Sequence, residues 1–344
     1  MSTEDLGAAE DLGAGEPLLE FREVGVTYGA NVPAVRGVSL RVAPGEVVGI
    51  AGESGCGKST LASTVLRLQP ASATVTGEVR FRVRNVVDLR WSEVRAMRWA
   101  GASMIFQGAL HALNPVRRVG DQIAEAIRVH EKSVSAAEVE ERVGRLLEEV
   151  GLAPGRAGQY PHQLSGGQRQ RVMIAMALAC GPELIIADEP TTALDVMVQE
   201  QVLSLLRDLV AQRNVSLVFI SHDLSVLSSL CDRIAVMYAG RIVELAPAAS
   251  VFGAARHPYS AALSAAFPRI GDPASRYAPA GLPGDPPVPA ELPAGCAFAP
   301  RCSRRVSECD LVDPPLVSIA DLASGSEVEV ACLRPLPLVE ETAR

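Results

Sequence analysis

A glycine-rich segment, GESGCGKST at residues 52–60, carries the clearest chemical potential in the sequence. It follows the apolar run Val47–Ala51 and precedes a helical stretch at residues 58–69. Glycines allow the backbone to curl until its N–H groups point at phosphate oxygens, and the helix N-terminus adds the positive end of its dipole. This order of strand, loop and helix predicts a phosphate-binding loop rather than a plain flexible turn.

Two side chains of this loop have specific expected roles. Lys58 supplies a point charge for the β- and γ-phosphates of a nucleotide, and the hydroxyl of Ser59 is placed to bind Mg²⁺. Cys56 occupies a variable position and has no assigned role. The other positions expected to surround the phosphates are Gly52, Glu53, Ser54, Gly55, Gly57 and Thr60.

A pair of carboxylates ends a second apolar run, LIIADEP at residues 184–190. Such pairs often mark only a solvated strand end, but beside a phosphate-binding loop they indicate a metal partner. We expect Asp188 to hold Mg²⁺, commonly through water, and Glu189 to orient and deprotonate an attacking water.

A third segment, LSGGQRQR at residues 164–171, opens an apolar helix. We expect Ser165 to cap this helix, with the amides of Gly166 and Gly167 exposed in its first turn. Exposed amides at a helix N-terminus suit a second phosphate contact.

The elements that must position these residues alternate along residues 18–267. Apolar runs at 47–51, 103–106, 184–187, 216–220 and 234–238 predict buried strands, so we expect an α/β fold with a largely parallel sheet. Between residues 91 and 180 the pattern is mostly helical, which predicts an inserted helical subdomain with an apolar face at Val139, Val143, Leu146, Leu147 and Val150. A second apolar stripe, in the helix before residue 216, contains Val198, Val202, Leu205, Leu206 and Leu209.

The two ends of the chain differ from this main domain. Residues 1–17 mix Gly, Ala, Glu and Asp without apolar periodicity and predict a mobile tail. After residue 267 prolines recur as far as Pro293, a spacing that excludes a helix or an inner strand and predicts an extended linker or wrapping arm. We expect three regions: the tail, the domain at 18–267, and a small Pro-rich and Cys-rich appendage at 268–344.

The order of these motifs resembles that of the ATP-binding-cassette ATPases, whose signature LSGGQ stands here at Leu164, Ser165, Gly166, Gly167 and Gln168. The likeness covers about residues 18–267 and implies the P-loop ATP-binding-cassette fold with its helical signature subdomain. In this family the signature of one cassette faces the P-loop of another, so the resemblance implies that ATP is bound between two chains.

The same resemblance implies roles for residues outside the three segments. Tyr28 would stack on adenine, Gln107 would sense the γ-phosphate and Mg²⁺, and His222 would touch the γ-phosphate. Asp195, in Ala193–Leu194–Asp195, would contact the partner cassette.

Further motifs resemble the ATPase subunits of importers for dipeptides, oligopeptides and sometimes nickel. They are MIFQ at 104–107, LNP at 113–115, HPY at 257–259 and GLPGDPPVPAELPAGCAFAPRC at 281–302. The family usually has Asp-Pro after the glutamine, whereas this chain has Gly108 and Ala109, a departure that concerns contact with the membrane subunit. The resemblance implies three kinds of partner: two transmembrane permease subunits, a second cassette, and an extracellular substrate-binding protein. The second cassette is usually a different, homologous chain in this subfamily, and the sequence leaves a second copy of this chain open.

Four of the seven cysteines, Cys296, Cys302, Cys309 and Cys332, are separated by 5, 6 and 22 residues. Four thiolates suit Zn²⁺ or an iron–sulfur cluster, and the spacing alone leaves zinc, a cluster or no metal open. The resemblance to peptide importers favours a [4Fe–4S] cluster, with Zn²⁺ as the alternative. The region has too few apolar residues to form its own core, so a bound metal would stabilise its fold. Arg301, Arg304 and Arg305 are near enough in sequence to offset the charge of a cluster.

Composition excludes several classes of protein. The 344 residues are 48% hydrophobic and carry a net charge of −8, so the sequence lacks the excess of basic residues that is typical of nucleic-acid-binding proteins. The apolar runs stay well below the roughly 18 residues that cross a bilayer, so the chain is not itself a channel. An acidic N-terminus without a basic n-region predicts no signal peptide, and we expect a peripheral protein on the cytoplasmic face of the cell membrane.

Together these patterns predict the ATPase subunit of a membrane importer. It would couple Mg·ATP binding and hydrolysis to uptake of dipeptides, oligopeptides or a similar small solute. A cassette that remodels nucleic acid or ribosomes usually has long coiled coils or two cassettes in one chain, and this sequence has neither. An inactive regulatory cassette is disfavoured because Ser165, Glu189 and His222 are intact.

Overall fold

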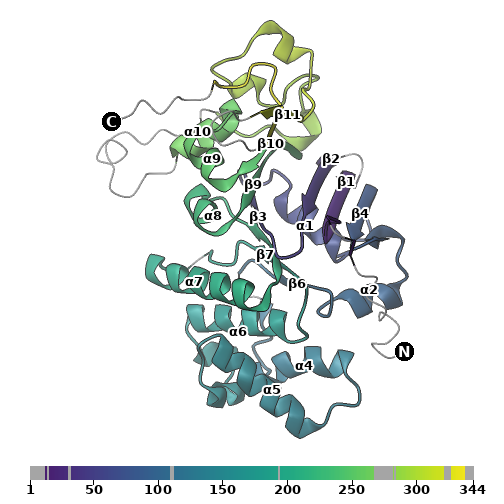
Figure 1. Cartoon of the computed structure of the whole chain (residues 1–344), viewed down its shortest axis with the longest axis vertical. Coiled ribbons are helices and arrows are strands. Elements are labelled where there is room, and N and C mark those ends of the chain that lie inside the picture. Colours follow the sequence, from purple (N-terminus) through teal and green to yellow (C-terminus); the bar gives the residue numbers. More distant parts are fainter. Residues whose placement is uncertain are drawn as a thin grey trace.

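The computed structural model describes residues 12, 13, 15–29, 32–108, 112–192, 194–266, 282, 284–320 and 327–337. Most of the predicted tail, and the first part of the predicted arm at residues 268–281, lie outside the described residues. Figure 1 shows a central sheet, a smaller sheet beside it, a group of helices at one end and the C-terminal appendage at the other.

The central sheet has the order β11-β12-β10-β9-β3-β8-β7-β6. Its parallel part confirms the five predicted strands: β3 (Val47–Ala51), β6 (Ala102–Ile105), β7 (Leu184–Asp188), β8 (Ser216–Ile220) and β9 (Arg233–Tyr238). Every residue of β3, β7 and β8 is buried. Strands that are covered on both faces are mostly apolar, which explains why these segments were visible as continuous apolar runs.

A second, antiparallel sheet was not predicted. It has the order β2-β1-β4-β5 and consists of β1 (Leu19–Tyr28), β2 (Val32–Val42), β4 (Ala73–Phe81) and β5 (Arg84–Asn85). Its strands bury only one face, and shifts of register interrupt the pairing of β1 with both neighbours. These bulges break the period-two alternation on which strand recognition depends.

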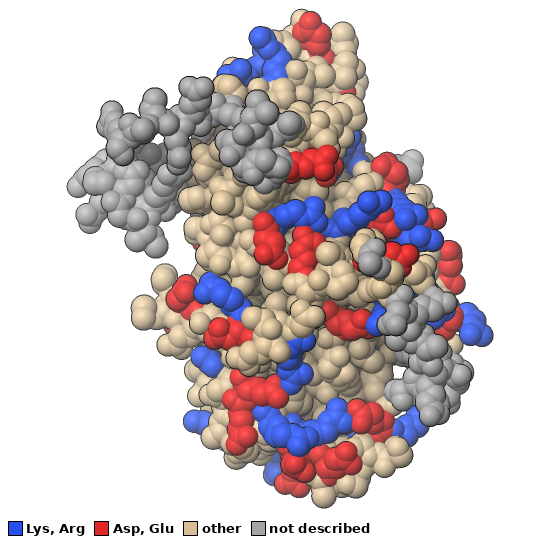
Figure 2. All heavy atoms as spheres, viewed as in Figure 1, with Lys and Arg blue, Asp and Glu red and all other residues tan. Residues whose placement is uncertain are grey.

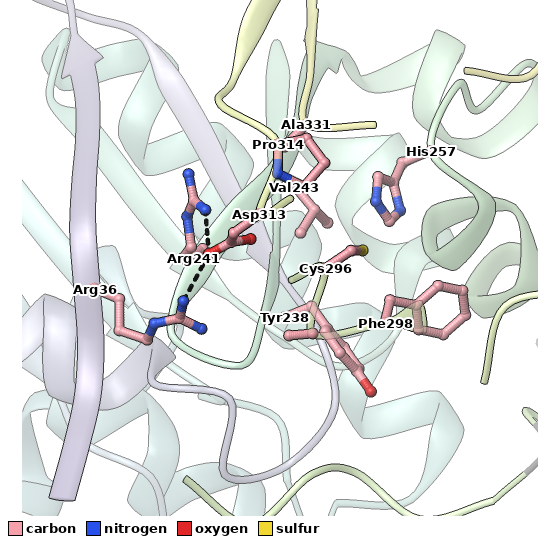
Figure 3. Close-up of a pocket in the computed structure, with 11 residues that line it drawn as sticks. Arg36, Tyr238, Arg241, Val243, His257, Cys296, Phe298, Asp313, Pro314 and Ala331 are labelled. Carbon is pink, nitrogen blue, oxygen red and sulfur yellow. Dashed lines mark hydrogen bonds and ion pairs between the residues drawn. The ribbon is translucent and has the colours of Figure 1, made fainter. Parts of the chain in front are cut away.

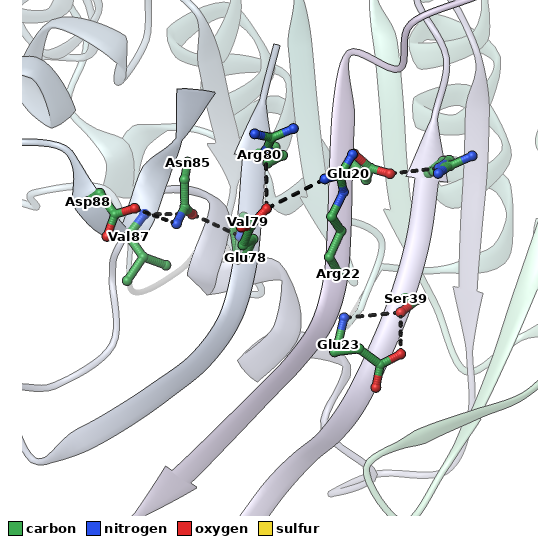
Figure 4. A network of polar contacts seen from close by, with 11 residues as sticks. Glu20, Arg22, Glu23, Ser39, Glu78, Val79, Arg80, Asn85, Val87 and Asp88 are labelled. Atoms are coloured by element: carbon green, nitrogen blue, oxygen red, sulfur yellow. Dashed lines mark hydrogen bonds and ion pairs between the residues drawn. The ribbon is translucent and has the colours of Figure 1, made fainter. Parts of the chain in front are cut away.

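Ion pairs link charged side chains of this sheet, both within one strand and between neighbouring strands, as Figure 4 shows. Glu20 on β1 accepts hydrogen bonds from Arg41 on β2 and pairs with Arg22, each at 2.7 Å. Burial alone would raise the pKa of Glu20, but the hydrogen bonds from Arg22 and Arg41 outweigh burial and hold that pKa below its usual value. On the face of the whole molecule that Figure 2 shows, basic and acidic side chains are also interspersed, without a large area of one sign.

The predicted helical block contains α2 (Trp91–Met97), α4 (Val119–His130), α5 (Ala136–Glu149) and α6 (Gly166–Leu178), with β6 and the short 3₁₀ turns Pro154–Gly158 and Pro161–Gln163 between them. The predicted apolar face of α5 is confirmed, since each of its residues is at most 6% exposed. In α7 (Val196–Arg213) the stripe is only partly right: Val202, Leu206 and Leu209 are buried, whereas Val198 and Leu205 are partly exposed.

The central sheet continues into the C-terminal part of the chain. After β9 come β10 (Arg241–Pro247), α9 (Ala248–Gly253) and α10 (Pro258–Ala266), while α8 (Leu224–Leu230) links β8 to β9. The appendage, here the described residues from 282 onward, contains the 3₁₀ turns η5 (Pro289–Glu291), η6 (Ala299–Arg301) and η7 (Ser307–Asp310) and the hairpin β11 (Val317–Ala320) and β12 (Glu327–Val330). Because β12 pairs with β10, the appendage extends the main sheet rather than forming a separate body.

A buried carboxylate and the HPY motif hold α10 against this junction. Glu244 on β10 is 1% exposed and accepts the backbone N–H groups of Arg256 and His257 at 2.7 and 2.8 Å. The Nδ1 atom of His257 in turn accepts the N–H of Tyr259 at 3.0 Å. Burial lowers the pKa of His257 to about 4, so the imidazole is neutral and can accept this bond.

None of the helices in the described part of the chain is both long and apolar enough to span a bilayer.

Close contact between α6 and α7 gives a prediction about two adjacent glycines. A Cβ atom at Gly167 would lie 2.4 Å from Cγ1 of Val198, whereas one at Gly166 would meet only Cδ2 of Leu194 at 3.5 Å. Gly167→Ala should therefore lower the free energy of unfolding by roughly 1–3 kcal/mol in urea titrations. Gly166→Ala is the matched control and should be neutral or slightly stabilising; equal effects of the two changes would contradict this packing argument.

Candidate nucleotide-binding and catalytic site

The loop between β3 and α1 (Lys58–Val65) passes very close to neighbouring backbone. Gly52 has φ +148° and Gly57 has φ +106°, and a Cβ atom on them would lie 2.3 Å from the carbonyl oxygens of Met237 and Ala34, respectively. Only glycine fits such approaches with a positive φ. These two glycines therefore allow the backbone to pass close to its neighbours as it curls around the side chain of Lys58.

The ammonium of Lys58 lies inside this curl. Its Nζ atom donates to the carbonyl oxygens of Gly52 at 2.7 Å and Glu53 at 2.9 Å, and the residue is 5% exposed. These partners are dipoles rather than full charges. The ammonium also lies 3.9 Å from Sγ of Cys56. A buried ammonium whose partners among the described residues carry no full charge favours an anion beside it, so the loop is suited to phosphate.

Two oxygen donors stand together at the start of α1. The hydroxyl of Ser59 donates to Oδ1 of Asp188 at 3.0 Å, and Asp188 is 6% exposed. Burial raises the pKa of Asp188; the hydrogen bond from Ser59 works against this effect, and the neighbouring charge of Glu189 adds to it. A buried carboxylate beside a hydroxyl is a donor set that fits Mg²⁺.

Three parallel strands bring a second group together at their carboxyl ends. Glu189, after β7, accepts hydrogen bonds from Nε2 of Gln107, after β6, at 2.9 Å and from Oγ1 of Thr192 at 3.0 Å. Nδ1 of His222, after β8, lies 3.6 Å from Oε1 of Glu189. Glu189 has φ +44°, a left-handed conformation that is uncommon for a glutamate. Thr192 was not predicted from the sequence, because a threonine three residues after a carboxylate is not a distinctive pattern.

These residues and the phosphate loop line one open cavity. Its walls include Ser54, Gly55, Gly57, Lys58, Ser59, Thr60, Gln107, Glu189 and His222. The cavity has a volume of about 530 Å³, within the range of sites that hold ligands of nucleotide size. The tertiary structure therefore brings part of the predicted loop together with Gln107, Glu189 and His222. The predicted residues Gly52, Glu53, Cys56 and Asp188 are not in the wall of this cavity, although Asp188 contacts Ser59.

Tyr28 lies beside the loop rather than in the wall of this cavity. Its hydroxyl donates to Oγ1 of Thr60 at 3.3 Å, at the end of β1. This contact places the phenol ring against the start of α1. A stacking role toward adenine remains a prediction.

The signature residues are distant from the P-loop of their own chain. Ser165 caps α6 as predicted, and its Oγ accepts the N–H of Gln168 at 3.3 Å while Oε1 of Gln168 accepts the N–H of Ser165 at 3.0 Å. Asp195 caps α7 by accepting the N–H of Val198 at 3.0 Å. Figure 1 shows α6 in the helical group, well separated from α1. Among the described residues the cavity wall contains none of Leu164, Ser165, Gly166, Gly167, Gln168 or Asp195.

The four cysteines of the appendage surround one small cavity. Cys296, Cys302, Cys309 and Cys332 line it together with His257, and burial raises the pKa of the Cys296 and Cys332 thiols. Within the described residues, however, no three side chains of His, Cys, Asp or Glu are grouped closely enough to hold a metal ion. The fold brings the cysteines to one place but does not form a coordination shell.

The arginines near these cysteines have other partners. Arg301, which the sequence suggested would offset cluster charge, forms a double ion pair with Glu53 in the P-loop, and Arg305 pairs with Asp310. Figure 3 shows the neighbouring junction, where Asp313 of the appendage meets Arg36 and Arg241 at 2.7 and 2.6 Å. The sequence did not reveal the pairing of Arg301 with Glu53, which lies far away in the chain, and the expectation that Arg301, Arg304 and Arg305 offset cluster charge stays a prediction.

Known proteins share both the sequence and the fold. Residues 35–192 match the ABC transporter family model, and residues 243–309 match that of the oligopeptide/dipeptide transporter C-terminal region. A putative peptide import ATP-binding protein of Brucella ovis is 44% identical, covering 88% of this chain and 94% of its own length. The dipeptide transport ATP-binding protein DppD of Bacillus subtilis is 45% identical, covering 84% and 86%.

Among solved structures, the ATP-binding cassette MJ0796, a dimer in a post-hydrolysis state bound to ADP and Pi, aligns with a TM-score of 0.60 and 30% identity. The alignment covers 67% of this chain and 98% of that chain. The predicted cassette fold is thereby confirmed. With its assembled P-loop site and its sheet-extending appendage, the chain belongs to the ABC transporter family and carries the oligopeptide/dipeptide transporter C-terminal region.

Proposed function

We propose that this chain is the ATP-hydrolysing subunit of a membrane importer that takes up dipeptides, oligopeptides or a similar small solute. The observation that carries the proposal is the single cavity in which Lys58, Ser59, Gln107, Glu189 and His222 meet. The matched C-terminal region and the peptide-import names of the relatives support the solute class.

The residues of the site fit Mg·ATP. The amides of residues 52–60 and the ammonium of Lys58 would bind the phosphates, Tyr28 would stack on adenine, and Ser59, Gln107 and Asp188 would hold Mg²⁺. When bound, the metal would neutralise charge that develops on the phosphates.

Glu189 is the proposed base. Its carboxylate, held by Gln107 and Thr192, would orient a water molecule and accept its proton. His222, 60% exposed on the other side of Glu189, would contact the γ-phosphate.

The separation of the signature from the P-loop supports a requirement for a second cassette. The signature residues of this chain would complete the nucleotide site of a homologous chain, whose own signature would complete this one. These residues are Leu164, Ser165, Gly166, Gly167, Gln168 and Asp195.

The further partners that we propose are two transmembrane permeases and an extracellular substrate-binding protein, with this chain peripheral on the cytoplasmic face of the cell membrane. Functionally, residues 18–267 would be the cassette, with its helical subdomain at about 91–180, and residues 268–344 the appendage.

For the appendage we propose a [4Fe–4S] cluster, with Zn²⁺ as the alternative. Four thiols that share one cavity are the right donor set for either metal. Burial raises the pKa of the Cys296 and Cys332 thiols, so their thiolates would need a cation to stabilise them.

Co-purification tests the transport proposal. The chain, tagged at its N-terminus and extracted anaerobically in mild detergent, should bring down two permeases, a second cassette and an extracellular binding protein, identified by mass spectrometry. Metal analysis of the same preparation should find iron rather than zinc. Ribosomal or nucleic-acid partners without a membrane chain would overturn the importer and leave only the ATPase.

Glu189→Gln should reduce the ATPase turnover of the assembled transporter by roughly 10²–10⁴-fold while ATP still binds, because only the proton acceptor is lost. Glu183→Gln, at the opposite end of β7, is the matched control and should retain turnover. Lys58→Ala should abolish tight ATP binding. If Glu189→Gln retained nearly wild-type turnover, the assignment of Glu189 as the catalytic base would be wrong.

Asp188→Asn should stabilise the nucleotide-free chain at pH 7. Because burial raises the pKa of Asp188, the folded state binds its proton more tightly than the unfolded state, and the charged form costs stability above that pKa. The gain should fade as the pH falls through the pKa of Asp188, and Mg·ATP should stabilise the variant less than the wild type. Thermal unfolding across pH measures both effects, with the exposed Asp208→Asn as control; a gain independent of pH would refute the electrostatic cause.

A further inference from the structure

The appendage reaches directly into the phosphate-binding loop. Arg301, at the end of η6, donates from Nη1 to Oε2 of Glu53 at 2.7 Å and from Nη2 to Oε1 at 3.0 Å. The Arg301 side chain is 6% exposed and that of Glu53 is 21% exposed. A double, nearly buried ion pair is stronger than a single pair on the surface, so we expect this contact to hold the two side chains in place.

Two tyrosines complete the contact. The hydroxyl of Tyr259 accepts the backbone N–H of Glu53 at 2.9 Å, and that of Tyr238 accepts from Nη1 of Arg301 at 3.3 Å. The guanidinium also lies 5.8 Å from the centre of the Tyr238 ring. Glu53 is thus held by its main chain from α10 and by its carboxylate from the appendage.

The position of Arg301 depends on the fold of the cysteine region. Its backbone N–H donates to the carbonyl of Phe298 at 3.0 Å, and the Phe298 ring packs edge-on against Tyr238 and Tyr259. Cys302 follows directly, and the N–H of Cys296 donates to the carbonyl of Cys309 at 2.8 Å. The turns that carry the cysteines therefore also place the guanidinium.

The charge of Glu53 explains why this contact matters. A carboxylate in a loop that binds a polyanion repels its ligand, and the repulsion is strong where burial limits screening by solvent. A guanidinium that pairs with both carboxylate oxygens cancels that charge and also keeps the side chain turned toward the appendage.

We propose that Arg301 is a positioning residue of the nucleotide site: it neutralises Glu53 and so makes ATP affinity depend on the fold of the cysteine appendage. This inference rests on the proposed ATP site, and it is distinct from any metal that the cysteines hold.

Binding of Mg·ATP to the full chain, measured by titration calorimetry, tests the proposal. Arg301→Gln should weaken binding roughly tenfold, or about 1.4 kcal/mol, because the Glu53 charge is left unpaired. The weakening should be larger at low ionic strength. In the double variant Glu53→Gln with Arg301→Gln, affinity should return to within about threefold of the wild type, since no charge remains to repel phosphate. Arg305→Gln, which breaks a half-exposed pair in the same appendage, should bind normally.

A wild-type affinity of Arg301→Gln would overturn the proposal, and so would a double variant as weak as the single one, which would reduce Arg301 to an anchor of the appendage. If Arg301→Gln does not fold, Arg301→Lys replaces it, with an expected weakening of about threefold that Glu53→Gln removes; no weakening refutes the proposal. Normal binding by Lys58→Ala would instead refute the ATP site itself.

Discussion

The close approach of the P-loop backbone to its neighbours is the constraint on which the rest of the structure depends. Gly52 and Gly57 allow the loop to pass where any Cβ atom would collide with a carbonyl oxygen of β9 or β2. This path is possible only because β3 lies between β8 and β9 in the sheet, with all three strands parallel. The carboxyl ends of parallel strands meet at one edge, so Glu189 and His222 arrive at the same cavity as the loop.

The site combines several features that cost stability in the isolated chain. Asp188 is a buried carboxylate, Lys58 is a buried ammonium solvated by carbonyls, and Glu189 has a left-handed backbone. The costs of the two buried charges would be offset if a cation bound beside Asp188 and a polyanion beside Lys58, because the charges of such ligands complement those of the buried groups. The large apolar core of the central sheet supplies the stability that tolerates such a site.

The appendage belongs to this arrangement rather than lying outside it. It extends the central sheet through β12, packs Phe298 on two tyrosines, and contacts β2 through the pair of Asp313 with Arg36. Through the ion pair of Arg301 with Glu53 it also contacts the phosphate loop. The turns that carry the cysteines and the phosphate loop are thus joined by direct contacts.

Local patterns in the sequence determined the parts of this protein that are continuous in the chain. The buried strands, the P-loop, the cap at Ser165 and the apolar face of α5 could all be predicted, because each depends on residues that are neighbours in sequence. The tertiary structure alone decided the antiparallel sheet, whose bulges hide its period, and the extension of the main sheet by β12. It also decided the partners of Arg301, Asp313 and Glu244, because an ion pair or a buried hydrogen bond joins residues that chain folding, not sequence spacing, brings together.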